Sequence, residues 1–154
     1  MSDYFATVHW ERNPAEDFPS SNYSRAHTWS FDGGVTVPAS PSPHIVKAPW
    51  SEAANVDPEE AFVASLSSCH MLFFLAFAAK QGVVVNSYRD EAVGVLEANA
   101  AGKMAMTTVT LRPRIEFDPA NTPTPEQLDE LHHRAHEHCF IANSVHTTIN
   151  IESQ

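Results

Sequence analysis

Short runs of apolar residues separated by turn formers dominate the first forty positions. Tyr4–Trp10 and Arg25–Phe31 are rich in aromatic and β-branched residues, a composition typical of strands. Asp32-Gly33-Gly34 predicts a tight turn into a third strand at Val35–Val37. Pro and polar turn residues between the first two strands and after the third predict loops.

A long apolar run, Ala61–Ala79, follows and carries no formal charge. Asp57-Pro58-Glu59-Glu60 precedes it with Asp at the N-cap, Pro at the first helical position and Glu at the third, where it can reach back to the cap amide. These features predict a helix of roughly 28 Å over the apolar run. Its length would suit a membrane span, but the serines, Cys69 and His70 in its middle favour a buried helix.

A helix that is apolar on all sides must be covered on all sides. One sheet of a single chain covers one face, so we expect a second copy of the chain to cover the other in a two-fold homodimer.

The second half of the chain is predicted to be mostly strands. Thr124-Pro125-Glu126-Gln127 has the pattern of a capping box and opens a second helix that runs to about Cys139, with Leu128, Leu131 and Ala135 on one face. Pro113 indicates an edge or a bulge. The strands are expected at Val83–Val85, Glu91–Ala98, Met104–Phe117 and Val145–Ile151. The order of elements predicts the α+β class with mostly antiparallel sheet.

The composition is that of one globular domain over residues 1–154, with 43% hydrophobic and 18% charged residues. Nine Lys and Arg against nineteen Asp and Glu give a formal charge of −10, which argues against nucleic acid and anionic membrane surfaces as partners. The first residues have neither a basic nor an apolar signal region, so we expect a cytoplasmic protein.

The two cysteines, Cys69 and Cys139, fit neither a disulfide-dense scaffold nor a zinc ribbon. They are either small buried hydrophobes or a redox pair. They can meet if the two predicted helices pack side by side, which the sequence alone leaves open.

Nine histidines are many for this length. His132 and His136 stand four residues apart, so a metal site on the second helix is conceivable, but four ligands would have to converge. We expect the histidines of this helix to lie mostly on its solvated face, and His70 to be a hydrogen-bonded core residue.

The segment Asp57-Pro58-Glu59-Glu60, continuing to Ser67-Ser68-Cys69-His70, resembles the Asx-Pro-Glu…Ser-x-Cys helix of the OsmC/Ohr family, the osmotically inducible and organic hydroperoxide resistance proteins. The segment Cys139–Ser144, before the last strand, and Arg25, ahead of Asp32-Gly33, match the layout of that family. His70 and Phe140 depart from the residues that many members have after each cysteine, so the chain resembles an OsmC-like branch.

The resemblance implies an OsmC-like fold: an intertwined homodimer whose sheets wrap two long central helices. It also implies a peroxidase that reduces organic hydroperoxides. Cys69 would be the peroxidatic thiolate, Cys139 the resolving thiol, and Arg25 with Glu59 a charged pair beside the reactive sulfur. No bound cofactor or metal is required, and an external dithiol, which the family resemblance suggests is a lipoylated protein, would complete the cycle.

Physical considerations refine these roles. A buried thiol is hard to ionise, so Cys69 needs a cation such as Arg25. Glu59 and Cys69 lie about 15 Å apart along one helix, so they cannot share a site directly. Either Arg25 spans the distance between them, or Glu59, with or without Arg25, reaches Cys69 from a partner chain; we favour the second. Glu52 and Glu60 are the other candidate carboxylates for Arg25.

Apolar side chains are expected to line a substrate pocket. Phe140, Ile141, Phe73 and Trp50 are the main candidates, while Trp29, Phe31 and Phe74 could equally be core residues. Two other functions stay open: a stress or small-molecule binding protein with weak or no peroxidase activity, and a metal-dependent protein that uses the His-rich helix.

Overall fold

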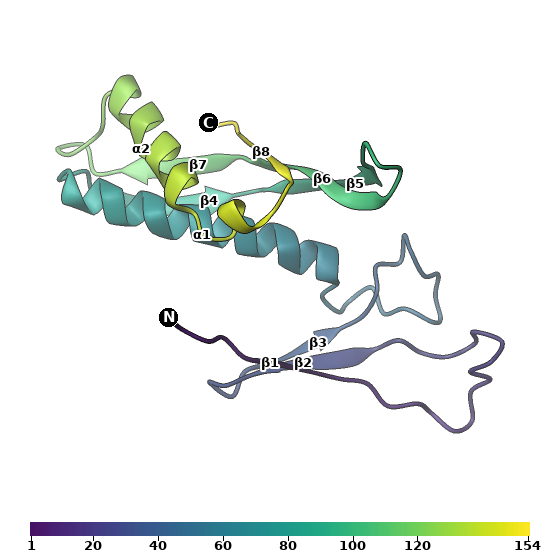
Figure 1. Ribbon diagram of the computed structural model, residues 1–154. Helices are drawn as coiled ribbons and strands as arrows, with labels where there is room; N and C mark the ends of the chain where they lie inside the picture. Colours follow the sequence, from purple (N-terminus) through teal and green to yellow (C-terminus); the bar gives the residue numbers. More distant parts are fainter. The chain divides into compact units, whose positions relative to one another are not determined.

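The computed structural model describes residues 1–154, which divide into two compact units, Met1–Ala61 and Phe62–Gln154. Each unit is described by itself (Figure 1). The single domain expected over residues 1–154 stays a prediction.

The first unit is a three-stranded antiparallel sheet in the order β1-β2-β3. The predicted turn at Gly33-Gly34 joins the last two strands, and Gly34 has a φ of 88°, a left-handed conformation that suits glycine. Ala39 is the buried apolar residue of this unit, so its sheet has little core of its own. The three strands, which confirm the prediction, are β1 (Ala6–His9), β2 (His27–Phe31) and β3 (Thr36–Ala39).

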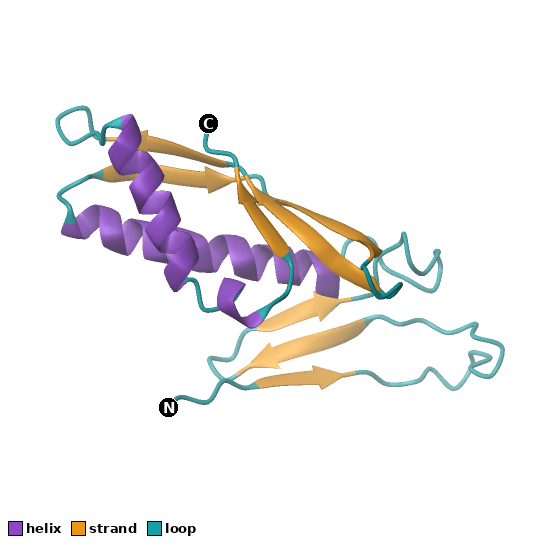
Figure 2. Cartoon of the chain, turned by 45° about the horizontal axis from the view of Figure 1, so that its top comes forward, coloured by secondary structure: helices purple, strands orange, loops and turns teal.

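The second unit packs two helices against two small sheets (Figure 2). One sheet pairs β4 with β7, and the other has the order β5-β6-β8 with β8 parallel to β6. The elements are α1 (Pro58–Lys80, beginning in the last residues of the first unit), β4 (Val85–Asp90), β5 (Val93–Ala98), β6 (Met104–Leu111), β7 (Pro113–Phe117), α2 (Pro125–His138), a 3₁₀ turn (Ala142–Ser144) and β8 (Thr148–Ile151).

The predicted caps of both helices are confirmed. The Asp57 carboxylate accepts a hydrogen bond from the Glu60 amide at 2.8 Å, and Glu60 accepts one from the Asp57 amide at 3.1 Å. Thr124 and Gln127 form the same reciprocal box at the start of α2. Each box satisfies backbone amides that have no partner inside the helix, which is why the helices begin where the sequence predicts.

One predicted strand, Met104–Phe117, is divided into β6 and β7. The backbone amide of Arg112 donates to the side-chain carboxylate of Asp90 at 2.6 Å instead of to a backbone carbonyl of a neighbouring strand. Pro113 has no amide hydrogen to donate, so the ladder stops here and β7 turns to pair with β4.

Helix α1 is long and apolar enough to cross a membrane by length and composition, a property that core helices of soluble proteins share. In the chain it packs on two apolar clusters. One joins it to α2 and consists of Phe74, Phe77, Ala78, Val83, Leu131 and Ala135. The other joins it to β6 and consists of Leu66, Val109 and Leu111. Only 28% of its most apolar window is buried.

Candidate functional site

The two cysteines lie on different elements and meet where α2 ends. Cys69 is half-buried near the middle of α1, and Cys139 is the C-cap residue of α2, with 1% of its surface exposed. Both are free thiols. Burial, and after it the neighbouring Cys69 thiol, raise the pKa of Cys139 to about 11. The two thiols are therefore neighbours, as side-by-side packing of the helices would require.

A pair of buried histidines holds the two helices together beside the thiols. His70 Nε2 lies 3.0 Å from His132 Nδ1, a hydrogen bond in which one ring donates and the other accepts. The rings are stacked, with centroids 5.3 Å apart and planes inclined by 9°. Since His70 follows Cys69 and His132 precedes Cys139 by two turns, this contact sets the register of the helices that carry the sulfurs.

The pair confirms one expectation and corrects another. His70 is a hydrogen-bonded core residue, as predicted. The expectation that the histidines of α2 lie on its solvated face is wrong for His132, which is buried, and incomplete for His136, which is half-buried. The sequence pattern could not show this, because His132 owes its burial to a partner on α1, distant in sequence. His133 and His138 are exposed as expected.

Burial makes the two paired imidazoles hard to protonate. It lowers the pKa of His70 to about 4, with further lowering by the neighbouring His132 and His136. It lowers the pKa of His132 to about 4 as well, although Asp129 and Asp90 act in the opposite direction. At neutral pH the pair is uncharged, which suits an apolar core.

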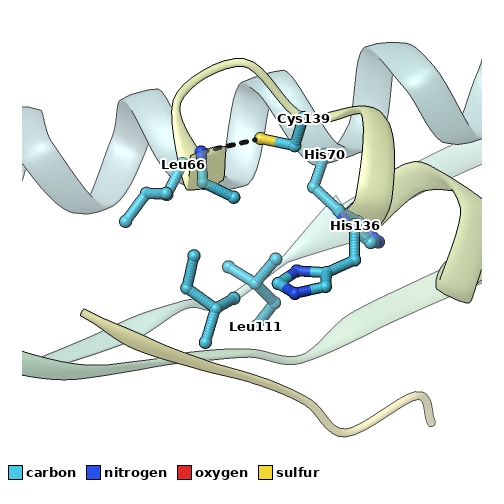
Figure 3. A pocket seen from close by; sticks show the side chains of 7 residues that line it. Leu66, His70, Leu111, His136 and Cys139 are labelled. Atoms are coloured by element: carbon cyan, nitrogen blue, oxygen red, sulfur yellow. Dashed lines mark hydrogen bonds between the residues drawn. The ribbon is translucent and has the colours of Figure 1, made fainter. Parts of the chain in front are cut away.

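A narrow recess opens beside Cys139 (Figure 3). It is lined by His70 and Leu66 from α1, by His136 and Cys139 from the end of α2, and by Leu111, Ala142 and Ile149. In this conformation it is too narrow for a water molecule. The Cys139 sulfur accepts a hydrogen bond from the Ala142 amide at 3.4 Å, drawn as the dashed line in Figure 3. The one sign in the sequence that His136 lies near Cys139 is its position three residues earlier on the same helix.

The expected substrate-pocket residues do not line this recess. Phe140 is 71% exposed and makes an edge contact with Phe73, with ring centroids 5.0 Å apart. Ile141 packs on the cluster around Leu66. Trp50 lies in the first unit, where its carbonyl accepts a hydrogen bond from the Arg25 amide. Phe73 and Phe140 instead contact each other and form an apolar surface. In the sequence, Phe73 lies close to Cys69, and Phe140 follows Cys139 directly.

Arg25 and Glu59 are not paired within the chain. The Arg25 guanidinium donates to the Tyr23 carbonyl at 2.9 Å and lies 3.9 Å from the centroid of the Tyr23 ring. No ion pair joins it to Glu59, Glu52 or Glu60. Glu59 lies in the first turn of α1, about 15 Å along the axis from Cys69. Within the first unit, the charge of Arg25 is thus not neutralised by one of these carboxylates.

A polar contact next to Cys69 ties α1 to β4. The Ser67 hydroxyl donates to the Asp90 carboxylate at 2.5 Å, and the other oxygen of Asp90 accepts the Arg112 amide. This bond fixes the face that α1 turns toward the sheet. No cluster of three or more His, Cys, Asp or Glu side chains is arranged to hold a metal ion.

The chain resembles solved structures over its whole length. It is 56% identical to an OsmC-like protein of unknown function from Vibrio cholerae, with 100% of each chain covered and a TM-score of 0.98. An organic hydroperoxide resistance protein OsmC from Legionella pneumophila is 15% identical, with 99% of this chain and 96% of that one covered and a TM-score of 0.70. OhrB of Bacillus subtilis, an organic hydroperoxide resistance protein, is 20% identical, with 98% of each chain covered and a TM-score of 0.63.

The two more distant structures show that the fold is shared, and they confirm the predicted α+β, OsmC-like class. A search of curated proteins finds no match. The family model described as OsmC-like protein matches residues 51–154, a stretch that includes both cysteines and more than half of the sequence. The chain therefore belongs to the OsmC/Ohr family.

Proposed function

We propose that the protein is a thiol-dependent peroxidase that reduces organic hydroperoxides to alcohols. The observation that carries the proposal is that Cys69 and Cys139, which come from two helices far apart in sequence, lie close enough for the Cys69 thiol to raise the pKa of Cys139. Two free thiols that are neighbours can be oxidised to a disulfide if their Cα atoms come within the distance that a disulfide spans. Two structures named as organic hydroperoxide resistance proteins share the fold, and their names support organic hydroperoxides as the proposed substrate class.

The reaction proceeds in two steps. The Cys69 thiolate attacks the outer oxygen of the hydroperoxide, the O–O bond breaks, and the alcohol leaves with a proton. Cys69 is then a sulfenic acid. The Cys139 sulfur attacks the Cys69 sulfur, a disulfide forms, and hydroxide leaves as water with the thiol proton. An external dithiol reduces the disulfide and returns both thiols.

The roles of the two cysteines follow from their surroundings. Cys69 is half-buried and so can be reached from outside, whereas Cys139 is fully buried and holds its proton tightly. The more accessible sulfur is the one a hydroperoxide meets first. The exposed Phe140 and its neighbour Phe73 offer apolar surface to an alkyl or aryl group.

Arg25 is the cation that we assign to the Cys69 thiolate. Its guanidinium has no carboxylate partner in the first unit and is held by the Tyr23 carbonyl and ring, so it remains available to an anion. We propose that Arg25 and Glu59 come to Cys69 from the partner chain of a homodimer.

The experiment that tests the proposal is mass spectrometry of the reduced protein before and after one equivalent of cumene hydroperoxide. We expect the loss of two mass units and a peptide in which Cys69 is joined to Cys139. The Cys139→Ser variant should stop at the sulfenic acid, which dimedone traps on Cys69, and the Cys69→Ser variant should not react. Intact thiols after the treatment would overturn the peroxidase and favour a binding protein with this fold.

A further inference from the structure

Three aromatic rings pack on one another in the loop that joins β1 to β2 in the first unit, the loop that Figure 1 shows in purple. The ring of Tyr23 lies against Phe18, with centroids 4.4 Å apart, and against Trp10, with centroids 5.6 Å apart. The Trp10 indole also donates a hydrogen bond to the Ser24 carbonyl at 2.9 Å. The position of the Tyr23 ring is therefore fixed within the loop itself.

The side chain of Arg25 packs on this ring. Its guanidinium carbon lies 3.9 Å from the centroid of the Tyr23 ring, a close contact between a cation and an aromatic face. Arg25 Nη1 donates to the Tyr23 carbonyl at 2.9 Å, and Arg25 Nη2 donates to the Ser21 carbonyl at 3.4 Å. One ring and two carbonyls of the same loop thus hold the guanidinium, an arrangement that we call the Tyr23 clamp.

An unusual backbone conformation accompanies the second carbonyl. Ser21 closes a turn by donating its amide to the Phe18 carbonyl at 2.9 Å, and its φ is 63°. This left-handed conformation is uncommon for a residue other than glycine, and such residues gather where the backbone serves a site. The strained residue is the one whose carbonyl meets Arg25, so the loop is shaped around the guanidinium.

We propose that Tyr23 is a positioning residue that holds Arg25 ready for the Cys69 thiolate. The inference rests on the proposed peroxidase function, in which Arg25 of one chain serves the partner's Cys69, and it adds a residue to that function. Tyr23 touches neither the hydroperoxide nor the sulfur in this role, because it acts only through Arg25.

The clamp holds the cation without neutralising it. An aromatic face and backbone carbonyls carry no full negative charge, whereas a carboxylate would cancel the charge of the guanidinium. Stacking covers the flat face of the guanidinium, and the two hydrogen bonds occupy two of its five N–H groups, so three stay free at its edge within the first unit. A thiolate can therefore still receive both the charge and the hydrogen bonds of Arg25.

Fixing the side chain in advance favours the first step of the reaction. An unrestrained arginine samples many rotamers, and only a fraction of the molecules would present the cation when the hydroperoxide arrives. The clamp restricts these rotamers before the reaction begins. Loss of the Tyr23 ring should therefore slow the attack of Cys69 on the hydroperoxide and leave the later formation of the disulfide unchanged.

The test is rapid mixing of the reduced wild type, Tyr23→Leu and Tyr23→Phe with cumene hydroperoxide. Oxidation of Cys69 is followed by mass, from the dimedone-trapped sulfenic acid and the disulfide together. We expect Cys69 to be oxidised about fivefold more slowly in Tyr23→Leu, the factor that corresponds to about 1 kcal/mol of lost cation–π attraction. Tyr23→Phe should react at the wild-type rate, because the Tyr23 hydroxyl takes part in none of the contacts with Arg25.

The matched control is Phe18→Leu, which removes a ring of the same cluster that does not lie on Arg25. Phe18 is 43% exposed, so leucine leaves no buried cavity, and Cys69 should be oxidised at the wild-type rate. A double-mutant cycle gives a second readout, which a merely structural role of Tyr23 would not produce. In the Arg25→Gln background, Tyr23→Leu should cause no further loss of rate, because no guanidinium is left to position.

The contact can also be measured in wild type alone, which keeps the proposal testable if Tyr23→Leu does not fold. The proton resonance of the Arg25 Nε–H group, assigned by its loss in Arg25→Gln, should be shifted upfield by the ring current of Tyr23. A resonance at the position of free arginine would overturn the clamp.

The outcomes separate the two proposals. The role of Tyr23 is overturned and the peroxidase stands if wild type is oxidised but Tyr23→Leu reacts as fast, if Phe18→Leu is slowed equally, or if Tyr23→Leu further slows Arg25→Gln. If wild type forms no sulfenic acid and no disulfide, both proposals are overturned.

Discussion

Gly94 shows how one residue fixes the contact between β5 and the helix. A Cβ atom at this position would lie 2.5 Å from Val63 Cγ2 on α1 and 2.5 Å from the end of the Met106 side chain. Met106 can move aside, but Val63 is branched and held by its helix. Glycine is therefore required by the close approach of the two elements rather than by backbone conformation.

We expect Gly94→Ala to lower the free energy of unfolding by about 1–3 kcal/mol, the usual range for an overpacked core. Urea unfolding measures the change. Gly33→Ala is the matched control, because a Cβ atom at Gly33 meets nothing within 4 Å. Equal stability of the two variants would show that the strand moves freely away from α1.

At the scale of elements, the contact between α1 and α2 depends on neutral imidazoles. His70 and His132 face each other across the helix interface, and burial lowers the pKa of both from 6.5 to about 4. The unfolded chain thus binds more protons than the folded one between these values. The stability contributed by the pair is fully present above pH 6.5 and is lost as the pH falls toward 4.

The free energy of unfolding should accordingly fall by a few kcal/mol between pH 7.5 and 4.5, as urea titrations at several pH values would show. In the double variant His70→Leu/His132→Leu both groups are replaced by apolar ones, so the curve should be flatter. The same slope in wild type and in the double variant would contradict this account of the interface.

At the scale of the whole molecule, α1 has more apolar surface than the elements of the second unit cover. Leu72 is 60% exposed, and small residues lie along the same side of the helix, among them Ala64, Ser68 and Ala76. Small side chains let a second helix approach closely, so this stripe is the surface that we propose for the homodimer.

Wild type should therefore sediment as a dimer, and Leu72→Glu, which places a charge on the stripe, should sediment as a monomer with a lower rate of peroxide reduction. Met104→Glu is the control, since Met104 is 64% exposed but lies on β6. A monomeric Leu72→Glu protein with the full wild-type rate would contradict a site completed by the partner chain.

The sequence by itself determined most of the elements, because their signals are local, although the strand predicted at Val83–Val85 is β4 at Val85–Asp90. The two capping boxes, the apolar run and the glycine turn each act over a few residues, and the helices begin where these patterns predict. The family also follows from the short motifs around the two cysteines. The division of Met104–Phe117 was not predictable, because it depends on a hydrogen bond from Arg112 to the distant Asp90.

Only the tertiary structure decided which side chains meet. Whether Cys69 reaches Cys139, whether His132 is buried and what His136 faces all depend on how α2 crosses α1. A helical pattern gives the face on which a residue lies but not the partner opposite it. The chemistry proposed here arises at that crossing, where residues distant in the sequence share one small buried space.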